Sequence, residues 1–206
     1  MNNKITIKVI NDISIIATDW DRLFEENEHL TPFQSRHLNE IWLNTYSYFK
    51  QNILIAISND IIIGIAPLII VKQFEFGLSF NKMQFIGANN FDYLDFIIHK
   101  EFDYCAKLFI DHVALKIEDW NICEFNNIKN TSIYENYFKA LGINFCNYNN
   151  HVCPVLYLHN DYSKILSSLN RGLRYDLKRG AALLSEKGKL EYHNIRVEEN
   201  INEELE

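Results

Sequence analysis

The sequence lacks any apolar run long enough to cross a lipid bilayer. The longest run, residues 61–71, is about half the length that a membrane-spanning helix needs, and Gly64 and Pro67 interrupt it. The N-terminal stretch also lacks the apolar core of a secretory signal, because Lys8 and Asp12 break it. We therefore expect a cytoplasmic protein without a transmembrane segment, either free in solution or peripheral to a membrane.

Cysteines are few and far apart. The four of them, Cys105, Cys123, Cys146 and Cys153, form no CxxC pair. Together with His151, the last two come closest to a set of metal ligands, but their spacing matches no standard zinc motif. We expect reduced, mostly buried thiols and no metal site.

Familiar catalytic signatures are absent as well. The sequence contains no GxGxxG, GxxxxGK[ST], HExxH or GxSxG motif, and its seven histidines have no recognisable partners. Residues 84–89, QFIGAN, nearly match the Q/R-x-x-G-x-G/A loop with which some transferases hold the pyrophosphate of coenzyme A. That loop works at the N-terminus of a helix, whereas an apolar strand is expected to follow here. We therefore do not expect a pyrophosphate loop at residues 84–89.

Positive charge is in deficit. The chain has 20 Lys and Arg against 27 Asp and Glu, a formal net charge of −7, which argues against nucleic-acid binding because that needs a cationic face. Hydrophobic residues make up 48% and aromatic residues 14% of the 206 residues, enough for the core of one domain. No repeat, low-complexity tract or Gly/Ser-rich linker divides the chain before about residue 160.

The apolar periodicity alternates between strand and helix patterns. Strands are expected at residues 5–9, 53–57, 61–71, 83–86, 94–98, 120–125, 143–148, 155–158 and 190–197. Helices are expected after a Thr18 cap, from a Ser35 cap to about residue 48, over 102–117, and from 131 or 132 to 141. Asn59 and Asp60 predict a tight hairpin turn, since both tolerate positive φ. The pattern predicts an α/β or α+β fold with a mixed sheet and helices on both faces.

Residues 83–98, MQFIGANNFDYLDFII, hold the best candidate for a ligand-facing site. Two apolar runs flank a polar turn that contains Asp92 and Tyr93, and Asp95 lies one residue into the second run. Strand ends are where a sheet usually offers polar groups to a ligand. Asp92, Tyr93 and Asp95 are therefore candidate acid/base groups, and the alternative is a hydrogen-bonded turn with a solvated edge.

Two other features are candidates to bind or admit a ligand. Gln34 precedes the Ser35 cap with a free side-chain amide, which makes it a candidate substrate-binding group. The alternative for Gln34 is a bond to the local backbone. Gly64 and Pro67 suggest a bulge or a splayed strand edge, which either opens a slot for a ligand or is a simple kink.

The chain becomes basic after residue 160. Asp161 is expected to cap a short helix through Leu169, and Asn170 to cap a second helix that Gly188 ends. Beside a stripe of leucines, the second helix carries four cations: Arg171, Arg174, Lys178 and Arg179. Such a group is a candidate for binding a phosphate or an acidic substrate, and the alternative is a solvated basic face.

Several motifs, in this order and spacing, resemble those of one family. They are Trp20-Asp21-x-Leu23, Thr31-Pro32-Phe33-Gln34-Ser35 followed by Trp42, residues 63–68 (IGIAPL), residues 85–87 (FIG), Asp92-Tyr93-Leu94-Asp95, Cys153-Pro154-Val155 and the basic helix. Together they cover nearly the whole chain. The set resembles the GNAT-type acyltransferases of the FemAB-like/CelD-like group, which are often described as cellulose- or polysaccharide-biosynthesis acetyltransferases.

The resemblance implies two tandem GNAT-like domains, an acyl-CoA or aminoacyl-tRNA donor, and transfer to an amine or hydroxyl of a saccharide or cell-envelope acceptor. It implies that residues 1–158 form the first domain and that residues 159–206 are a basic helical connector into a second. As the N-terminal half of such an enzyme, the chain is expected to work with a second GNAT-like domain or with another copy of itself. The alternative is a non-catalytic half-domain that acts as a protein-interaction module.

Overall fold

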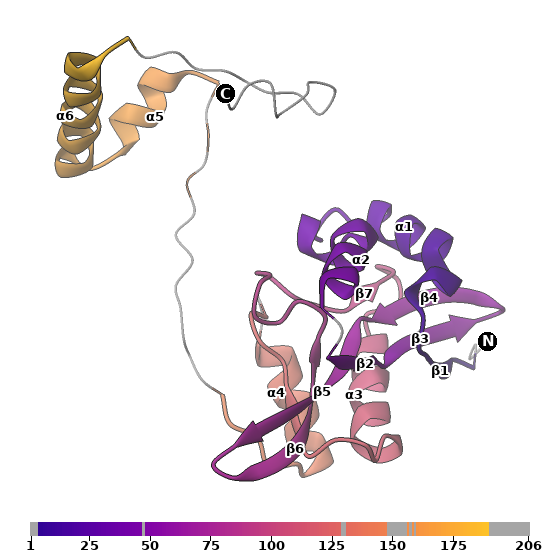
Figure 1. Ribbon diagram of the computed structural model, residues 1–206. Helices are drawn as coiled ribbons and strands as arrows, with labels where there is room; N and C mark the ends of the chain where they lie inside the picture. The colour runs from indigo at the N-terminus through magenta and orange to yellow at the C-terminus, as the bar shows by residue number, and fades with distance from the viewer. Residues whose placement is uncertain are drawn as a thin grey trace. The chain divides into compact units, whose positions relative to one another are not determined.

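The computed structural model describes residues 4–46, 48–128, 131–147, 156, 158 and 160–189. Contacts divide the chain into two compact units, Met1–Asn147 and Tyr148–Glu206, and each is described by itself (Figure 1). The domain boundary expected after residue 158 stays a prediction.

The first unit contains most of the helices and strands. Its strands are β1 (Thr6–Ile10), β2 (Phe49–Gln51), β3 (Ile53–Ser58), β4 (Ile61–Ala66), β5 (Leu68–Glu75), β6 (Leu78–Phe85), β7 (Ile97–Ile98) and β8 (Ile122–Glu124). Its helices are the 3₁₀ turns η1 (Ile13–Ile16) and η2 (Pro32–Gln34), with α1 (Ala17–Glu25), α2 (Arg36–Thr45), α3 (Cys105–Lys116) and α4 (Thr131–Leu141). The second unit contains α5 (Tyr162–Ser168) and α6 (Arg171–Lys187). None of these helices combines the length and the apolar character that crossing a bilayer requires.

Within the described ranges, the strands form two four-stranded sheets, in the orders β1-β3-β4-β7 and β2-β5-β6-β8. The sheets meet at Pro67, which separates β4 from β5 and, lacking an N–H group, cannot extend the hydrogen-bond ladder. The amide of Asn52 donates to the carbonyl of Leu68, and the amide of Ile86 to that of Pro67, both at 2.9 Å. These two bonds carry the pairing past the break. The interruption expected around Pro67 is therefore a change from one sheet to the other within a bent layer.

The layer is mixed, as the sequence predicts. Its neighbouring strands are antiparallel, except that β6 and β8 run parallel over residues 82–84 and 122–124. A parallel pair needs a crossover connection, and α3 lies within that connection.

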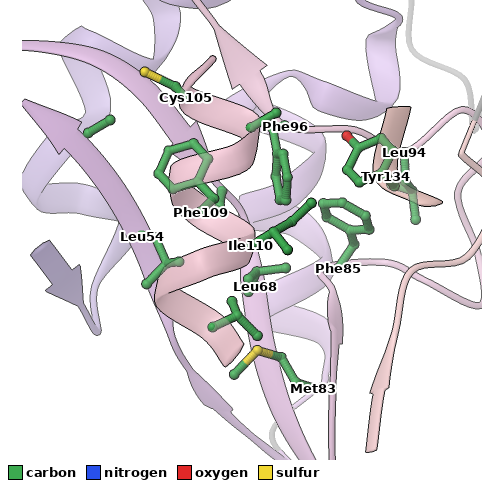
Figure 2. Close-up of a cluster of buried hydrophobic side chains, with 14 of the residues drawn as sticks. Leu54, Leu68, Met83, Phe85, Leu94, Phe96, Cys105, Phe109, Ile110 and Tyr134 are labelled. Atoms are coloured by element: carbon green, nitrogen blue, oxygen red, sulfur yellow. The ribbon is translucent and has the colours of Figure 1, made fainter. Parts of the chain in front are cut away.

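Alternate strand residues face two separate cores. On β3, Leu54 and Ala56 join the core under α3, whereas Ile53 and Ile55 join the core under α1 and α2. Figure 2 shows the first core, in which the ring of Phe109 on α3 lies among side chains from the strands. Helices therefore cover both faces of the layer, and the predicted α+β fold class is confirmed.

One hairpin turn and three helix N-caps that short sequence motifs predict are confirmed. Asn59 and Asp60 join β3 to β4 with φ of 48° and 63°, as expected of a tight hairpin. The side chains of Ser35, Asp161 and Asn170 accept backbone N–H groups at the starts of α2, α5 and α6. At these positions the short-range chemistry alone decides the structure.

Other boundaries differ from the predictions. Thr18 caps nothing, because Asp12 caps η1 and α1 continues directly from η1. Of the strand expected over residues 94–98, only Ile97–Ile98 forms a strand, because residues 94–96 belong to the preceding loop. Residues 143–147 form no strand. The strand expected over 155–158 is described only at residues 156 and 158, and that over 190–197 lies outside the described residues.

Candidate functional site

A loop formed by residues 87–96 interrupts one edge of the bent layer. β6 pairs with β5, and β7 pairs with β4 on the same side, so the chain leaves the layer after β6 and rejoins it at β7. Gly87 opens the loop with φ of 74°, and a Cβ atom there would overlap the ring of Phe91, so glycine is required. The amides of Asn90 and Phe91 both donate to the carbonyl of Gly87, at 2.8 and 2.9 Å. The 87–96 loop therefore begins with a tight, defined turn.

The helices on the α2 face fasten the loop from one side. The indole Nε1 of Trp42 donates to Oδ1 of Asn90 at 2.9 Å, and Nε2 of Gln34 donates to the carbonyl oxygen of Tyr93. The other end of the Gln34 amide accepts from the backbone and hydroxyl of Thr31, at 2.8 and 2.7 Å. The Gln34 side chain is only 2% exposed. Of the two interpretations of Gln34, this geometry favours the bond to the backbone over binding of a ligand.

The α4 face fastens the loop from the other side. The hydroxyl of Tyr134 donates to Oδ1 of Asp95, which also accepts from the amide of Phe96 at 2.8 Å. Nδ2 of Asn127 donates to the carbonyl of Phe91 at 2.7 Å. Burial raises the pKa of Asp95 against the opposing effect of the hydrogen bonds from Tyr134 and Phe96. Burial, and then the charge of Asp95, raise the pKa of Tyr134 as well.

The three candidate acid/base residues therefore have different surroundings. Asp92 is exposed to solvent, whereas Tyr93 and Asp95 are partly buried. Tyr93 has φ of 54°, so the segment does not alternate as a strand would. Asp95 is held against α4 and the carbonyl of Tyr93 against η2. Of the three, Asp92 is the one whose carboxylate is open to a molecule in solution.

A polar floor that the sequence analysis missed lies beside this loop on β6. Gln84 is 3% exposed, and its Oε1 is buried without a hydrogen-bond partner among the residues that the structure describes, as is Oε1 of Gln51 on β2. Both residues pair with Ile69 of β5, so their side chains lie on the same face of the sheet. Beside them Lys82 forms an ion pair with Glu124 at 2.7 Å. The signal is Gln84, a polar residue inside the apolar run 83–86, two positions after Lys82.

One depression of the surface lies away from this loop. It runs along α1 and is lined by Thr18, Asp21, Arg22, Glu25 and Glu26. Arg22 already forms ion pairs there with Asp19 on its own helix and with Glu26 just after that helix, each at 3.1 Å. No residue that the sequence singles out as a site candidate lines this depression, and we assign it no role.

The cationic side chains of α6 differ in whether they bind other parts of their own unit. Nη1 of Arg174 donates to the carbonyls of Ser167 and Leu169, both at 2.9 Å, and so closes the C-terminal end of α5. Arg171 and Lys178 are exposed, and neither forms an ion pair within the described part of the chain. Of the predicted phosphate-binding set, Arg174 has a structural task, whereas Arg171 and Lys178 remain open to a ligand.

The three described thiols follow the expectation of burial only in part, since Cys105 is buried and Cys123 is intermediate. Burial raises the pKa of Cys105 to about 11 and that of Cys123 to about 12, whereas Cys146 is exposed. His151 and Cys153, the other members of the discounted metal-ligand set, lie outside the described residues. The remainder of the described chain contains no group of three residues that could hold a metal ion.

The fold is similar to those of several solved acetyltransferases. A ribosomal-protein-alanine N-acetyltransferase from Brucella melitensis biovar Abortus is 15% identical, with a TM-score of 0.45, over 74% of this chain and 100% of that one. A GNAT family acetyltransferase from Staphylococcus aureus is 16% identical, with a TM-score of 0.43, over 73% of this chain and 98% of that one. An aminoglycoside N-acetyltransferase in complex with CoA is 12% identical, with a TM-score of 0.46, over 75% of this chain and 97% of that one. No protein-family model matches the sequence, and no curated protein does. A likeness at this level concerns the order of helices and strands and assigns no activity to this chain.

Proposed function

We propose that this chain is part of an acyltransferase of the FemAB-like/CelD-like group, which transfers an acyl or aminoacyl group to an amine or hydroxyl of a saccharide or cell-envelope acceptor. One observation carries the proposal: four of the motifs that together resemble this group, those at residues 31–42, 63–68, 85–87 and 92–95, meet at the 87–96 loop.

The first two of these motifs supply contacts from outside the loop. The motif at residues 31–35 supplies Gln34, which holds the carbonyl of Tyr93. The following Trp42 holds Asn90. The motif at residues 63–68 supplies Pro67, whose carbonyl accepts from Ile86 at the entry to the loop. A set of residues selected only for packing would not need to converge on one polar loop, which is why we place the acceptor site there.

Within this site we assign proton transfer to Asp92. Its carboxylate is exposed, so it can reach an acceptor hydroxyl or amine without moving the loop. Tyr93 and Asp95, the other two candidates, are assigned to positioning, because each already binds another part of the unit.

The donor we propose is an acyl-CoA, and the residues we assign to its phosphates are Arg171 and Lys178. Both are exposed on α6, and guanidinium and ammonium groups are the usual partners of phosphate. Arg174 is left out because it closes α5. A second GNAT-like domain, or a second copy of the chain, is proposed to complete the donor site.

The donor assignment is tested by titration calorimetry of acetyl-CoA into the full chain, alone and mixed with a candidate second domain. We expect the double variant Arg171→Gln/Lys178→Gln to bind roughly tenfold more weakly, since two charge-assisted contacts are lost. Lys164→Gln, which removes an exposed cation from α5, is the matched control and should bind normally. Absence of binding by the unaltered chain in both settings would remove the donor assignment.

The acceptor assignment is tested by kinetics once a donor is found. Asp92→Asn should lower kcat by about a hundredfold or more, the usual contribution of a general base, while the affinity for the donor stays unchanged. Asp60→Asn, at the exposed β3–β4 turn, is the control. Equal activities of the two variants would contradict the role of Asp92.

A second candidate function, a non-catalytic interaction module, is favoured by one observation on α6. Leu173 and Leu177 are each 45% exposed and Leu184 is 55% exposed, and α6 buries no residue in the described part of its unit. Light scattering after gel filtration separates the two candidates. A complex that Leu173→Gln/Leu177→Gln disrupts, in a chain that does not bind acetyl-CoA, would favour the module, and a monomer that binds acetyl-CoA would favour the enzyme.

A further inference from the structure

The β5–β6 hairpin ends in three large apolar side chains that face water. Phe74, Phe76 and Leu78, here called the apolar tip, are 73%, 100% and 69% exposed. Figure 1 shows this hairpin extending beyond the helices of the first unit. Single exposed apolar residues are common on proteins, but three at the end of one projecting hairpin, with Phe74 and Leu78 on its opposite faces, mark a contact surface.

The backbone of the turn does not explain why Phe76 is there. Phe76 and Gly77 join β5 to β6 with φ of 52° and 81°. The β3–β4 turn has similar values, 48° and 63°, with Asn59 and Asp60. Asn, Asp and Gly are the residues that such turns favour, and a bulky aromatic residue at positive φ is strained. The chain therefore keeps Phe76 against a local conformational cost, and its side chain is the remaining reason for it.

The size of the apolar tip argues against a stable protein partner. Stable interfaces bury roughly 1,200–2,000 Å² in total, whereas an aromatic side chain offers only about 150–250 Å². Three convex side chains fall well short of such an interface. A lipid bilayer, by contrast, needs no complementary surface, because apolar side chains enter it one by one.

The charges around the apolar tip indicate whether the charge of the lipid headgroups would contribute to binding. Lys72 and Glu75 are the charged residues within the outer part of the hairpin, both are exposed, and their charges are opposite. The whole chain has a formal net charge of −7, which disfavours attraction to an anionic surface. We infer that the apolar tip inserts into the interfacial layer of a lipid bilayer through apolar contact and does not require an anionic headgroup. This inference does not depend on the proposed acyl transfer.

The test is co-sedimentation of the full chain with phosphatidylcholine vesicles, and with vesicles that also contain phosphatidylglycerol. We expect binding to the phosphatidylcholine vesicles that is at least as strong as binding to the mixed vesicles, and a loss of roughly fivefold or more for Phe76→Asn. Asparagine suits the positive φ of this turn, so this variant should melt no lower than the unaltered chain. Leu115→Gln, which removes a side chain that is 66% exposed on α3, is the control for general stickiness and should bind normally.

A second measurement reports insertion directly. In Phe76→Trp, the tip fluorescence should be quenched by vesicles of brominated phosphatidylcholine, whereas the tryptophan emission of Leu115→Gln should not change. The inference is overturned if the unaltered chain binds neither vesicle, or if Phe76→Asn and Leu115→Gln bind equally. Binding only to phosphatidylglycerol, abolished by salt, would also overturn it in favour of a charge contact. A dimer in solution that Phe76→Asn dissociates would overturn it in favour of a second copy of the chain.

Discussion

The two ends of β6 lead into turns of opposite character. Its N-terminal end follows the apolar tip, where Phe76 is fully exposed, and its C-terminal end leads into the 87–96 loop. Polar groups in that loop are bound from both faces of the layer, by Trp42 on one side and Tyr134 on the other. The comparison teaches that the polar side chains at one end of β6 serve to hold a loop, whereas the exposed apolar side chains at the other end hold nothing in their own unit. Hydrogen bonds from both faces fix the shape of the loop, whereas the apolar tip leaves its side chains exposed for a contact.

The largest expected effect is a difference in stability between alanine variants of the glycines in the two turns. Gly87→Ala should lower the free energy of unfolding by about 3 kcal/mol or more, because the backbone is strained and the new methyl overlaps Phe91. Gly77 has a similar positive φ, but no atom lies near the methyl group that Gly77→Ala would add. This variant should therefore lower the free energy of unfolding by only about 1 kcal/mol. Urea denaturation of both variants measures the difference. Equal losses would mean that the crowding at Gly87 is unimportant.

The next effect tests the bond that holds the loop to α4. Tyr134→Phe keeps the ring but removes the hydroxyl that donates to Asp95. A hydrogen bond to a buried charged group contributes about 1.5–3 kcal/mol, so a loss of about 2 kcal/mol is expected in urea denaturation. Tyr48→Phe, on a tyrosine that is 58% exposed, should change little. A loss no greater than that of the control would show that the bond does not stabilise the fold.

The pH dependence of stability sharpens the same contrast. Because the folded state raises the pKa of Asp95 above 3.8, it holds that proton more tightly than the unfolded chain does. The resulting contribution to stability is complete below the ordinary pKa and is lost as the pH rises through the raised pKa. Asp95→Asn cannot titrate and keeps an oxygen for the Tyr134 hydroxyl. Its urea midpoint should therefore rise relative to the unaltered chain across that window, and a constant difference would contradict the assignment.

The smallest effect concerns the other end of β6 and has the opposite sign. Phe76→Asn should raise the Tm by roughly 2 °C, because asparagine relieves the strain of a positive φ. Differential scanning calorimetry measures the change, with Asn59→Asp as a control at a turn that already carries suitable residues. A lower Tm would show that Phe76 packs against its own unit, and the apolar tip would then be a structural feature.

Much of the fold could be predicted because short-range chemistry determines it. The turn at Asn59 and the cap at Ser35 depend on neighbours within a few residues. The fastening of the 87–96 loop could not be predicted, since Asn127 bonds across 36 positions and Gln34 across 59. The different surroundings of Asp92 and Asp95 could not be predicted either, because the positive φ of Tyr93 turns the backbone between them.

The parallel pairing of β6 with β8 has a consequence for the order of folding. The ion-paired residues Lys82 and Glu124 are 42 positions apart, whereas β5 and β6 can zip together across a two-residue turn. Non-local pairing is slow because loop closure precedes it, so we expect β8 to join late, after α3 has docked. Until then the outer side of β6 is an unpaired template for another chain. Refolding at high concentration should therefore lose material to aggregation at this step, and dilution should recover it.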